Sequence, residues 1–141
     1  MDFSTARILV DFGLLILIWM IQLTVYPSFS YFKGEELLPW HSTYTKRITA
    51  LVAPLMIGQL VIYGILLVDI GSFFAVAGIS LVLILWIITF TIFVPLHNSI
   101  HNNEHTSKIL EKLTRLNWIR TTLWTLLFLW SLKDYLSHQP I

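Results

Sequence analysis

Two long stretches of the chain carry no charged residue. They cover residues 48–68 and 70–96, and only Asp69 separates them. A helix needs about 20 mostly apolar residues to cross a bilayer, so each stretch is long enough to cross once. Backbone groups in lipid must be hydrogen-bonded within the protein, which leaves helices and closed barrels. Because the apolar residues run on without alternating at period two, the sequence predicts helices.

Two further stretches bring the number of expected spans to four. Residues 6–26 form an apolar run that ends before Pro27, and proline disfavours helix in the residue before it. Residues 116–136 form the fourth span, with Arg120 near enough to its start for the guanidinium to reach the membrane surface. The sequence therefore predicts one all-α domain over residues 1–141, an integral membrane four-helix bundle with up-down-up-down topology.

Composition agrees with a membrane protein and removes several function classes. Only 12% of the residues are charged, against about 25% in a typical soluble domain. The net charge of +1 argues against a nucleic-acid partner, which requires a strongly basic face. The chain has no cysteine, so disulfides, thiolate catalysis and thiolate metal sites are excluded.

The distribution of basic residues predicts the orientation. Four spans put both termini and the Asp69 turn on one side of the membrane, and that side holds Arg7 and Lys133. The other side holds the remaining seven basic residues: Lys33, Lys46, Arg47, Lys108, Lys112, Arg115 and Arg120. Lys and Arg are enriched in cytoplasmic loops. We therefore expect both long loops in the cytoplasm and both termini outside, in a bacterial inner membrane.

Histidines follow the third span at helical spacing. His97, His101 and His105 lie four residues apart, so they share one face if the third helix extends into the cytoplasm. Imidazole is a ligand for Zn, Cu, Fe and Ni, and His101 and Glu104 have the three-residue separation found in helical carboxylate–histidine sites. This pattern predicts metal ligands at His97, His101 and Glu104. The alternative is a solvated polar face at the end of a helix.

A fourth histidine lies at the same expected depth. Pro39 favours a helix that begins just before His41, and in an antiparallel bundle this helix start lies level with the end of the third span. His41 is then expected to face His97, and a metal or haem held by His41, His97 and His101 is the predicted cofactor. The alternative interpretation is a capped helix start with polar residues at the membrane interface.

Three other polar residues belong to the same expected cavity. Tyr44 follows His41 by three residues, Asn98 adjoins His97, and Arg120 opens the fourth span. We expect Tyr44, Asn98 and Arg120 to hold and activate a substrate, although Arg120 could equally bind lipid headgroups. In the first span, the acid Asp11 lies one turn from Arg7, and an interfacial pair of the two is the expected arrangement.

Several motifs together resemble a known family. They are Tyr26-Pro27 closing the first span, Val94-Pro95-Leu96-His97-Asn98 closing the third, and Asn117-Trp118-Ile119-Arg120-Thr121 opening the fourth. The layout resembles the small four-span membrane family that includes the fungal anthrone oxygenases, with matching residues at Pro95, Asn98 and Arg120. The resemblance implies oxidation of a reactive aromatic ring without a standard cofactor motif. The histidines depart from that pattern and favour a metal. A weaker similarity, in size and span count, is to the haem-associated bacterial protoporphyrinogen oxidase, whose characteristic first-span histidine is absent.

These observations support one main hypothesis and two alternatives. The main one is an oxidoreductase or oxygenase-like enzyme with a His-rich metal or haem site at the cytoplasmic end, acting on a small aromatic or quinone-like substrate. The first alternative is a non-enzymatic accessory or scaffolding membrane protein. The second is a metal-ion channel or carrier, which needs a continuous polar path to Asp11 with Gln59 as a step. The bilayer is a partner in every case, and a homo-oligomer is compatible with each.

Overall fold

The computed structural model describes residues 3–32, 34–102 and 107–137. Within that part the chain is helical almost throughout and forms no strand. The first half comprises α1 (Phe3–Met20), the π-helix η1 (Ile21–Val25), α2 (Tyr26–Ser28), the 3-10 helices η2 (Phe29–Tyr31) and η3 (Gly34–Glu36), and α3 (Leu37–Asp69). The second half comprises α4 (Phe73–Ile88), the π-helix η4 (Thr89–Phe93), α5 (Val94–His101) and α6 (Ser107–Ser137).

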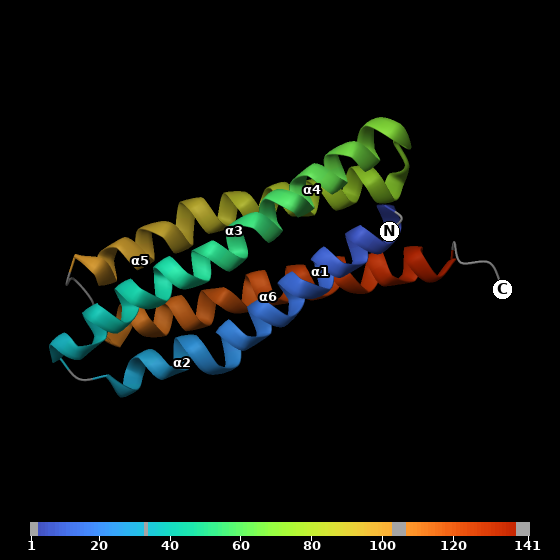
Figure 1. Cartoon of the computed structure of the whole chain (residues 1–141). Coiled ribbons are helices and arrows are strands. Elements are labelled where there is room, and N and C mark those ends of the chain that lie inside the picture. Colours follow the sequence, from blue (N-terminus) through green and yellow to red (C-terminus); the bar gives the residue numbers. More distant parts are fainter. Residues whose placement is uncertain (1–2, 33, 103–106, 138–141) are drawn as a thin grey trace.

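The long helical stretches lie side by side (Figure 1). The start of α1, the turn between α3 and α4 and the end of α6 lie at one end of the molecule, which we call the terminal end. The start of α3, the end of α5 and the start of α6 lie at the opposite end. We call this the histidine end, because α3 and α5 carry His41 and His97 there.

Two helix boundaries differ from expectation. The third stretch ends at His101, because Asn102 leaves helical geometry as the C-cap (φ −80°, ψ 9°). The fourth helix already begins at Ser107. The third helix therefore does not extend beyond His101 as one helix carrying all three histidines would require. His105 and Glu104 lie outside the described residues. At the terminal end, residues 70–72 form a turn in which Gly71 has a φ of 57°, so the expected 70–96 span is helical only from Phe73.

Each π-helix lies directly before a proline. η1 precedes Tyr26-Pro27 and η4 precedes Val94-Pro95. Proline has no N–H to donate and its ring collides with the carbonyl four residues earlier, so a regular α-turn cannot form there. The wider turn accommodates the proline: Tyr26 N–H donates to Ile21 O, and Val94 N–H donates to Thr89 O. Such insertions rotate the side chains that follow and are frequent at functional sites.

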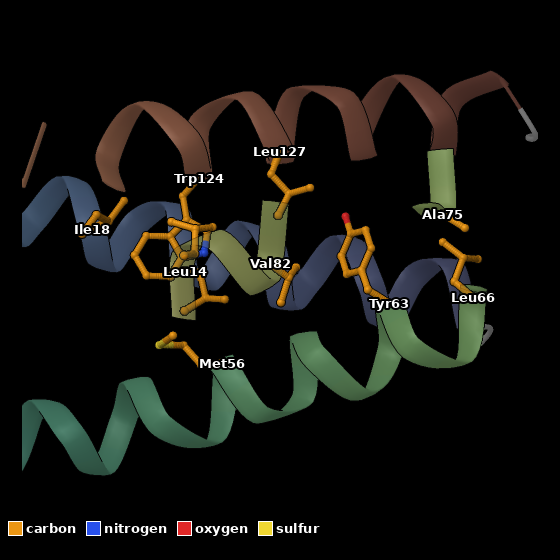
Figure 2. Packing of buried hydrophobic residues seen from close by; sticks show 10 residues of the cluster. Leu14, Ile18, Met56, Tyr63, Leu66, Ala75, Val82, Trp124 and Leu127 are labelled. Carbon is orange, nitrogen blue, oxygen red and sulfur yellow. The ribbon is translucent and has the colours of Figure 1, made fainter. Parts of the chain in front are cut away.

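Apolar packing holds the four stretches together in two clusters. The larger one fills the terminal half of the bundle, and Figure 2 shows its side chains meeting between the helices. Its members are Leu14, Ile18, Met56, Tyr63, Leu66, Ala75, Val82, Leu85, Trp124 and Leu127. The second fills the histidine end around Phe29, Leu37, Phe93, Ile100 and Leu113. In a bilayer such packing stabilises the bundle through van der Waals contacts, because lipid tails are as apolar as the side chains themselves.

The outer surface is apolar and the interior holds polar groups. Exposed side chains include Phe12, Ile57, Val61, Leu83, Ile87 and Leu129. Buried ones include Arg7, Asp11, Gln22, His41, Gln59, Asn117 and Arg120. Three described stretches are long and apolar enough to cross a membrane: Phe3–Tyr31, Leu37–Asp69 and Phe73–His101. The stretch α6 is also long but carries more charge. This surface is compatible with an integral membrane protein.

The close approach of α3 to α4 depends on Gly78. A Cβ at Gly78 would lie 2.6 Å from Tyr63 Cδ1 and nearer still to Cε1. The Tyr63 ring is fully buried and its hydroxyl is tied to Asp11, so it has no room to move. We predict that Gly78→Ala lowers the free energy of unfolding by about 1–3 kcal/mol, seen as a lower Tm in detergent. Gly58→Ala is the control, since nothing lies within 4 Å of its Cβ position, and it should stabilise slightly. Equal Tm values for the two variants would refute the contact.

Candidate functional site

The expected approach of His41 to His97 is present in the structure. His41 lies near the start of α3 and His97 in the first turn of α5, and His41 Nε2 is 2.8 Å from His97 Nδ1. The two rings are stacked, with centroids 5.1 Å apart. His41 is only 1% exposed. In a hydrogen bond between two imidazoles one nitrogen must accept, so the two rings cannot both be imidazolium.

Tyr26 extends the pair on the other side of His97. The Tyr26 hydroxyl is 3.0 Å from His97 Nε2, so both ring nitrogens of His97 are engaged. Tyr26 follows the π-helix η1 and is buried. The widened turn therefore brings to the interior a side chain that the sequence identified only as the end of a span. A Tyr-Pro pair closing an apolar run was the signal that could have found it.

Arg120 of α6 closes the chain of hydrogen bonds. Its Nη2 donates to the Tyr26 hydroxyl at 3.3 Å, and its Nε and Nη2 donate to Asn117 Oδ1 at 3.0 and 2.7 Å. The guanidinium carbon lies 3.6 Å from the centre of the Phe93 ring. Within the described part of the chain, these contacts are with neutral groups and aromatic faces. A buried cation held in this way attracts an anionic or oxygen-bearing ligand.

A network of amides supports the guanidinium. Asn117 Nδ2 donates to Gln22 Oε1 at 2.9 Å, and Gln22 Nε2 donates to Thr114 O at 3.2 Å. The Thr121 hydroxyl lies 3.3 Å from the same Gln22 oxygen. Because Asn117 is bonded on both sides, its oxygen has one orientation and fixes the plane of Arg120.

Arg120 favours one direction for the hydrogen bonds that link Tyr26, His97 and His41. A guanidinium can only donate, so the Tyr26 oxygen accepts from Arg120. We infer that the Tyr26 proton is then directed to His97 Nε2, which lies 3.0 Å away. That nitrogen then accepts, and the His97 proton lies on Nδ1, facing His41 Nε2. The hydrogen-bond network thus assigns a neutral His97 in the Nδ1–H tautomer. Each residue thus donates a hydrogen bond to the next, in the order Arg120, Tyr26, His97 and His41.

The hydrogen-bonded residues Arg120, Tyr26 and His97 border a cavity of about 320 Å³ between α3 and the stretch from α4 to α5. Polar lining comes from Tyr26, Tyr44, Thr89, His97, Asn98 and Arg120, and apolar lining includes Val52, Met56, Trp86 and Phe93. Phe90 and Val94 line the cavity and are also exposed on the outer surface. The cavity therefore opens sideways, through the apolar face of the bundle. Small-molecule sites span about 300–1,000 Å³, so this volume suits a small aromatic molecule better than a porphyrin.

Some of the site residues predicted from the sequence lie together in the structure, and others do not. His41, Tyr44, His97, Asn98 and Arg120 lie around or against this cavity. His101 is exposed at the end of α5, and Glu104 lies outside the described residues. Within the described ranges, no group of three or more His, Cys, Asp or Glu side chains could hold a metal ion. A metal on His97 would also have to displace Tyr26 or His41.

Asp11 forms a separate buried cluster nearer the terminal end. Gln59 Nε2 and the Tyr63 hydroxyl donate to its two oxygens at 2.7 and 2.9 Å, and Trp124 Nε1 donates to Gln59 Oε1 at 3.3 Å. The expected interfacial pair of Arg7 with Asp11 is wrong, because both are buried and the ion pair of Arg7 is with Asp134 at 2.7 Å.

Among residues 3–32, 34–102 and 107–137, the hydrogen bonds of the Asp11 cluster do not continue to Arg120. Gln59 is the step expected from the sequence, and Trp124 follows it. Trp124 then meets Arg120 only through its ring face, with the guanidinium carbon 5.8 Å from the ring centre. An indole ring does not carry ions, so this contact disfavours the ion-channel alternative.

Comparison with known proteins finds no family model, no curated protein and no solved structure that matches this chain.

The engagement of both His97 nitrogens predicts the metal content. Protein purified from metal-replete cells should contain well below one transition-metal atom per chain by elemental analysis, because the nitrogens that would ligate are already hydrogen-bonded. His97→Ala should not change that content. A stoichiometric metal that disappears in His97→Ala would contradict this and support the metal site expected from the sequence.

Proposed function

We propose that the chain is an integral membrane protein whose four helical stretches, α6 included, cross the bilayer in up-down-up-down order. The apolar surface supports this, since α6 exposes Leu126 and Leu129 between its charged ends. The orientation follows the charge distribution, with the histidine end cytoplasmic in a bacterial inner membrane. Because the chain has no cysteine, impermeant labelling of single cysteines introduced at Lys112 and Lys133 would test it: only the second should react from outside.

We further propose that it is an oxidoreductase or oxygenase-like enzyme acting on a small aromatic or quinone-like molecule. The observation that carries this is the convergence of Arg120, Tyr26 and His97 on one laterally open cavity. A lipophilic molecule would enter from the bilayer between Phe90 and Val94. Its oxygen would lie at Arg120, where the guanidinium favours the anionic form.

The residues at the cavity support removal of a proton from an aromatic hydroxyl. The substrate proton passes to the Tyr26 oxygen while the Tyr26 proton passes to His97 Nε2, and the His97 Nδ1 proton passes to His41 Nε2. The products are a substrate oxyanion beside Arg120 and an imidazolium at His41, so charge is conserved. The site supplies a general base and an oxyanion donor, two contributions that each accelerate reactions strongly.

An aromatic oxyanion is electron-rich, and dioxygen is the oxidant class that this proposal requires. Oxidation of a dihydric phenol removes two electrons and two protons, and dioxygen takes up both to give hydrogen peroxide. This agrees with the resemblance to the anthrone oxygenase family, which implies oxidation of a reactive ring without a standard cofactor motif. A metal on His41 and His97 is the alternative route, and the metal content decides between them.

The competing proposal is an accessory membrane protein without catalysis. An accessory role does not require a buried series of hydrogen-bonded ionisable residues beside a cavity. Burial of Arg120 without a carboxylate partner among the described residues costs stability, and a stabilising ligand at the cavity offsets that cost. This observation favours the enzyme.

Oxygen uptake tests the enzyme proposal. Purified protein with duroquinol, a fully methylated dihydric phenol, should consume oxygen faster than the protein-free solution. Arg120→Met should reduce the rate by about 100-fold or more, as loss of an oxyanion donor does. Tyr26→Phe keeps the packing and should also reduce it strongly by breaking the proton chain. Arg115→Met, an exposed position on the same helix, is the control. Equal rates in all four proteins would refute the proposal and favour the accessory role.

A further inference from the structure

The cavity of the candidate site has a lateral opening between α3 and the stretch from η4 to α5. One edge of this opening consists of Phe90, Val94 and Asn98, which follow one another at four-residue intervals. All three line the cavity and are exposed. The other edge includes Thr49 and Ala53 of α3, which also line the cavity. The lateral opening therefore runs along the helices.

The lateral opening becomes more polar toward the histidine end. Its edges are formed by Ala53 and Phe90 at the apolar end and by Thr49 and Asn98 at the polar end. Lys46 lies three residues before Thr49 and seven before Ala53, so it continues the same face of α3. At 1.5 Å rise per residue, Lys46 lies about 10 Å from Ala53 along the helix. The opening thus leads from apolar side chains to a cation.

The polar end of the lateral opening is basic. Lys46 is exposed, and among the described residues no carboxylate lies within ion-pair distance of its ammonium. The described residues that line the cavity include no Asp or Glu. Arg47 follows Lys46 directly, and His101 lies three residues after Asn98; both are exposed. The proposed topology puts this basic end at the cytoplasmic surface of the membrane.

An anionic phospholipid matches this arrangement. Its phosphate lies at the membrane surface, where the long side chain of Lys46 can carry its ammonium to the interface. One acyl chain then runs inward along the apolar part of the opening, between Ala53 and Phe90. Basic pockets between transmembrane helices on the cytoplasmic side bind anionic headgroups. A soluble anion would use the cation alone and leave the apolar part of the opening unfilled.

We propose that the lateral opening binds an anionic phospholipid, with its headgroup at Lys46 and Asn98 and one acyl chain between Ala53 and Phe90. The ammonium pairs with the phosphate, and the Asn98 amide donates to headgroup oxygens. This rests on the proposed crossing of the membrane and not on the proposed enzyme activity. Because the lipid lies at the entrance of the cavity, a ligand that enters from the bilayer exchanges with it.

Competition between two phospholipids tests the headgroup. The full-length protein in detergent is mixed with equal amounts of dioleoyl phosphatidylglycerol, which is anionic, and dioleoyl phosphatidylcholine, which has the same chains and no net charge. Native mass spectrometry gives the ratio of the two lipids bound. We expect the wild-type protein to favour phosphatidylglycerol and Lys46→Gln to reduce the ratio about fivefold, which corresponds to about 1 kcal/mol. Lys112→Gln removes an exposed charge outside the cavity lining and, as the matched control, should leave the ratio unchanged.

A second variant tests the acyl chain. In Ala53→Phe the larger side chain fills the apolar part of the lateral opening. The amount of both lipids bound should therefore fall, while their ratio stays as in the wild-type protein. Ala50→Phe is the control, because Ala50 is exposed on the same helix and lies outside the cavity lining. It should leave the bound amounts unchanged.

The outcomes separate this proposal from the proposed function. Equal binding of the two lipids to the wild-type protein overturns the site. An equal loss of preference in Lys46→Gln and Lys112→Gln also overturns it, because general attraction to a basic surface then explains the preference. Unchanged lipid binding in Ala53→Phe overturns the placement of the chain. None of these results bears on oxygen uptake, whereas cysteine labelling that shows no crossing of the membrane would overturn both proposals.

Discussion

The buried guanidinium of Arg120 is the constraint on which the site depends. It can only donate, so the Tyr26 oxygen accepts from it, and we infer from this the proton position on Tyr26 and the tautomer of His97. It is held in place by Asn117, which is itself bonded to Gln22, and by the face of Phe93. Helices α2, α5 and α6 therefore meet α3 through one set of hydrogen bonds. The positive charge is balanced by no carboxylate in these contacts, which gives the cavity its preference for an oxygen-bearing ligand.

The two π-helices explain how side chains of an otherwise regular helical bundle come to face one another at the cavity. Tyr26 follows η1 and His97 follows η4. Without the extra residue in each π-helix, both side chains would be rotated by about 100°, one residue's turn of an α-helix, and would point away from each other. The same wide turns place Thr89 and Phe93 against Arg120. The two π-helices that precede Pro27 and Pro95 thus position the side chains of the site. The cavity lies beside η4, where the helix is widest.

The sequence could predict the helical class, the apolar stretches and the convergence of His41 with His97, because these follow from hydrophobic run lengths and antiparallel connection. It could not predict the end of the third helix at His101, since one asparagine in a polar segment decides it. Tyr26 and Gln22 were missed as site residues because their inward orientation depends on the π-helix η1. The Tyr26-Pro27 pair marks the end of that helix, but it does not tell which side chains face the interior. The pairing of Arg7 with Asp134 rather than Asp11 joins residues from opposite ends of the chain, and local spacing carries no information about such contacts.

The tautomer of His97 tests the account most directly. Nitrogen-15 NMR of histidine-labelled protein in lipid distinguishes a protonated from an unprotonated ring nitrogen. We expect a neutral His97 with its proton on Nδ1, the rarer form in water, and a coupling from that nitrogen to His41 Nε2. Tyr26→Phe should remove the fixed preference. A proton on Nε2 of His97, or two histidines that behave like free imidazoles in water, would contradict the directed chain from Arg120.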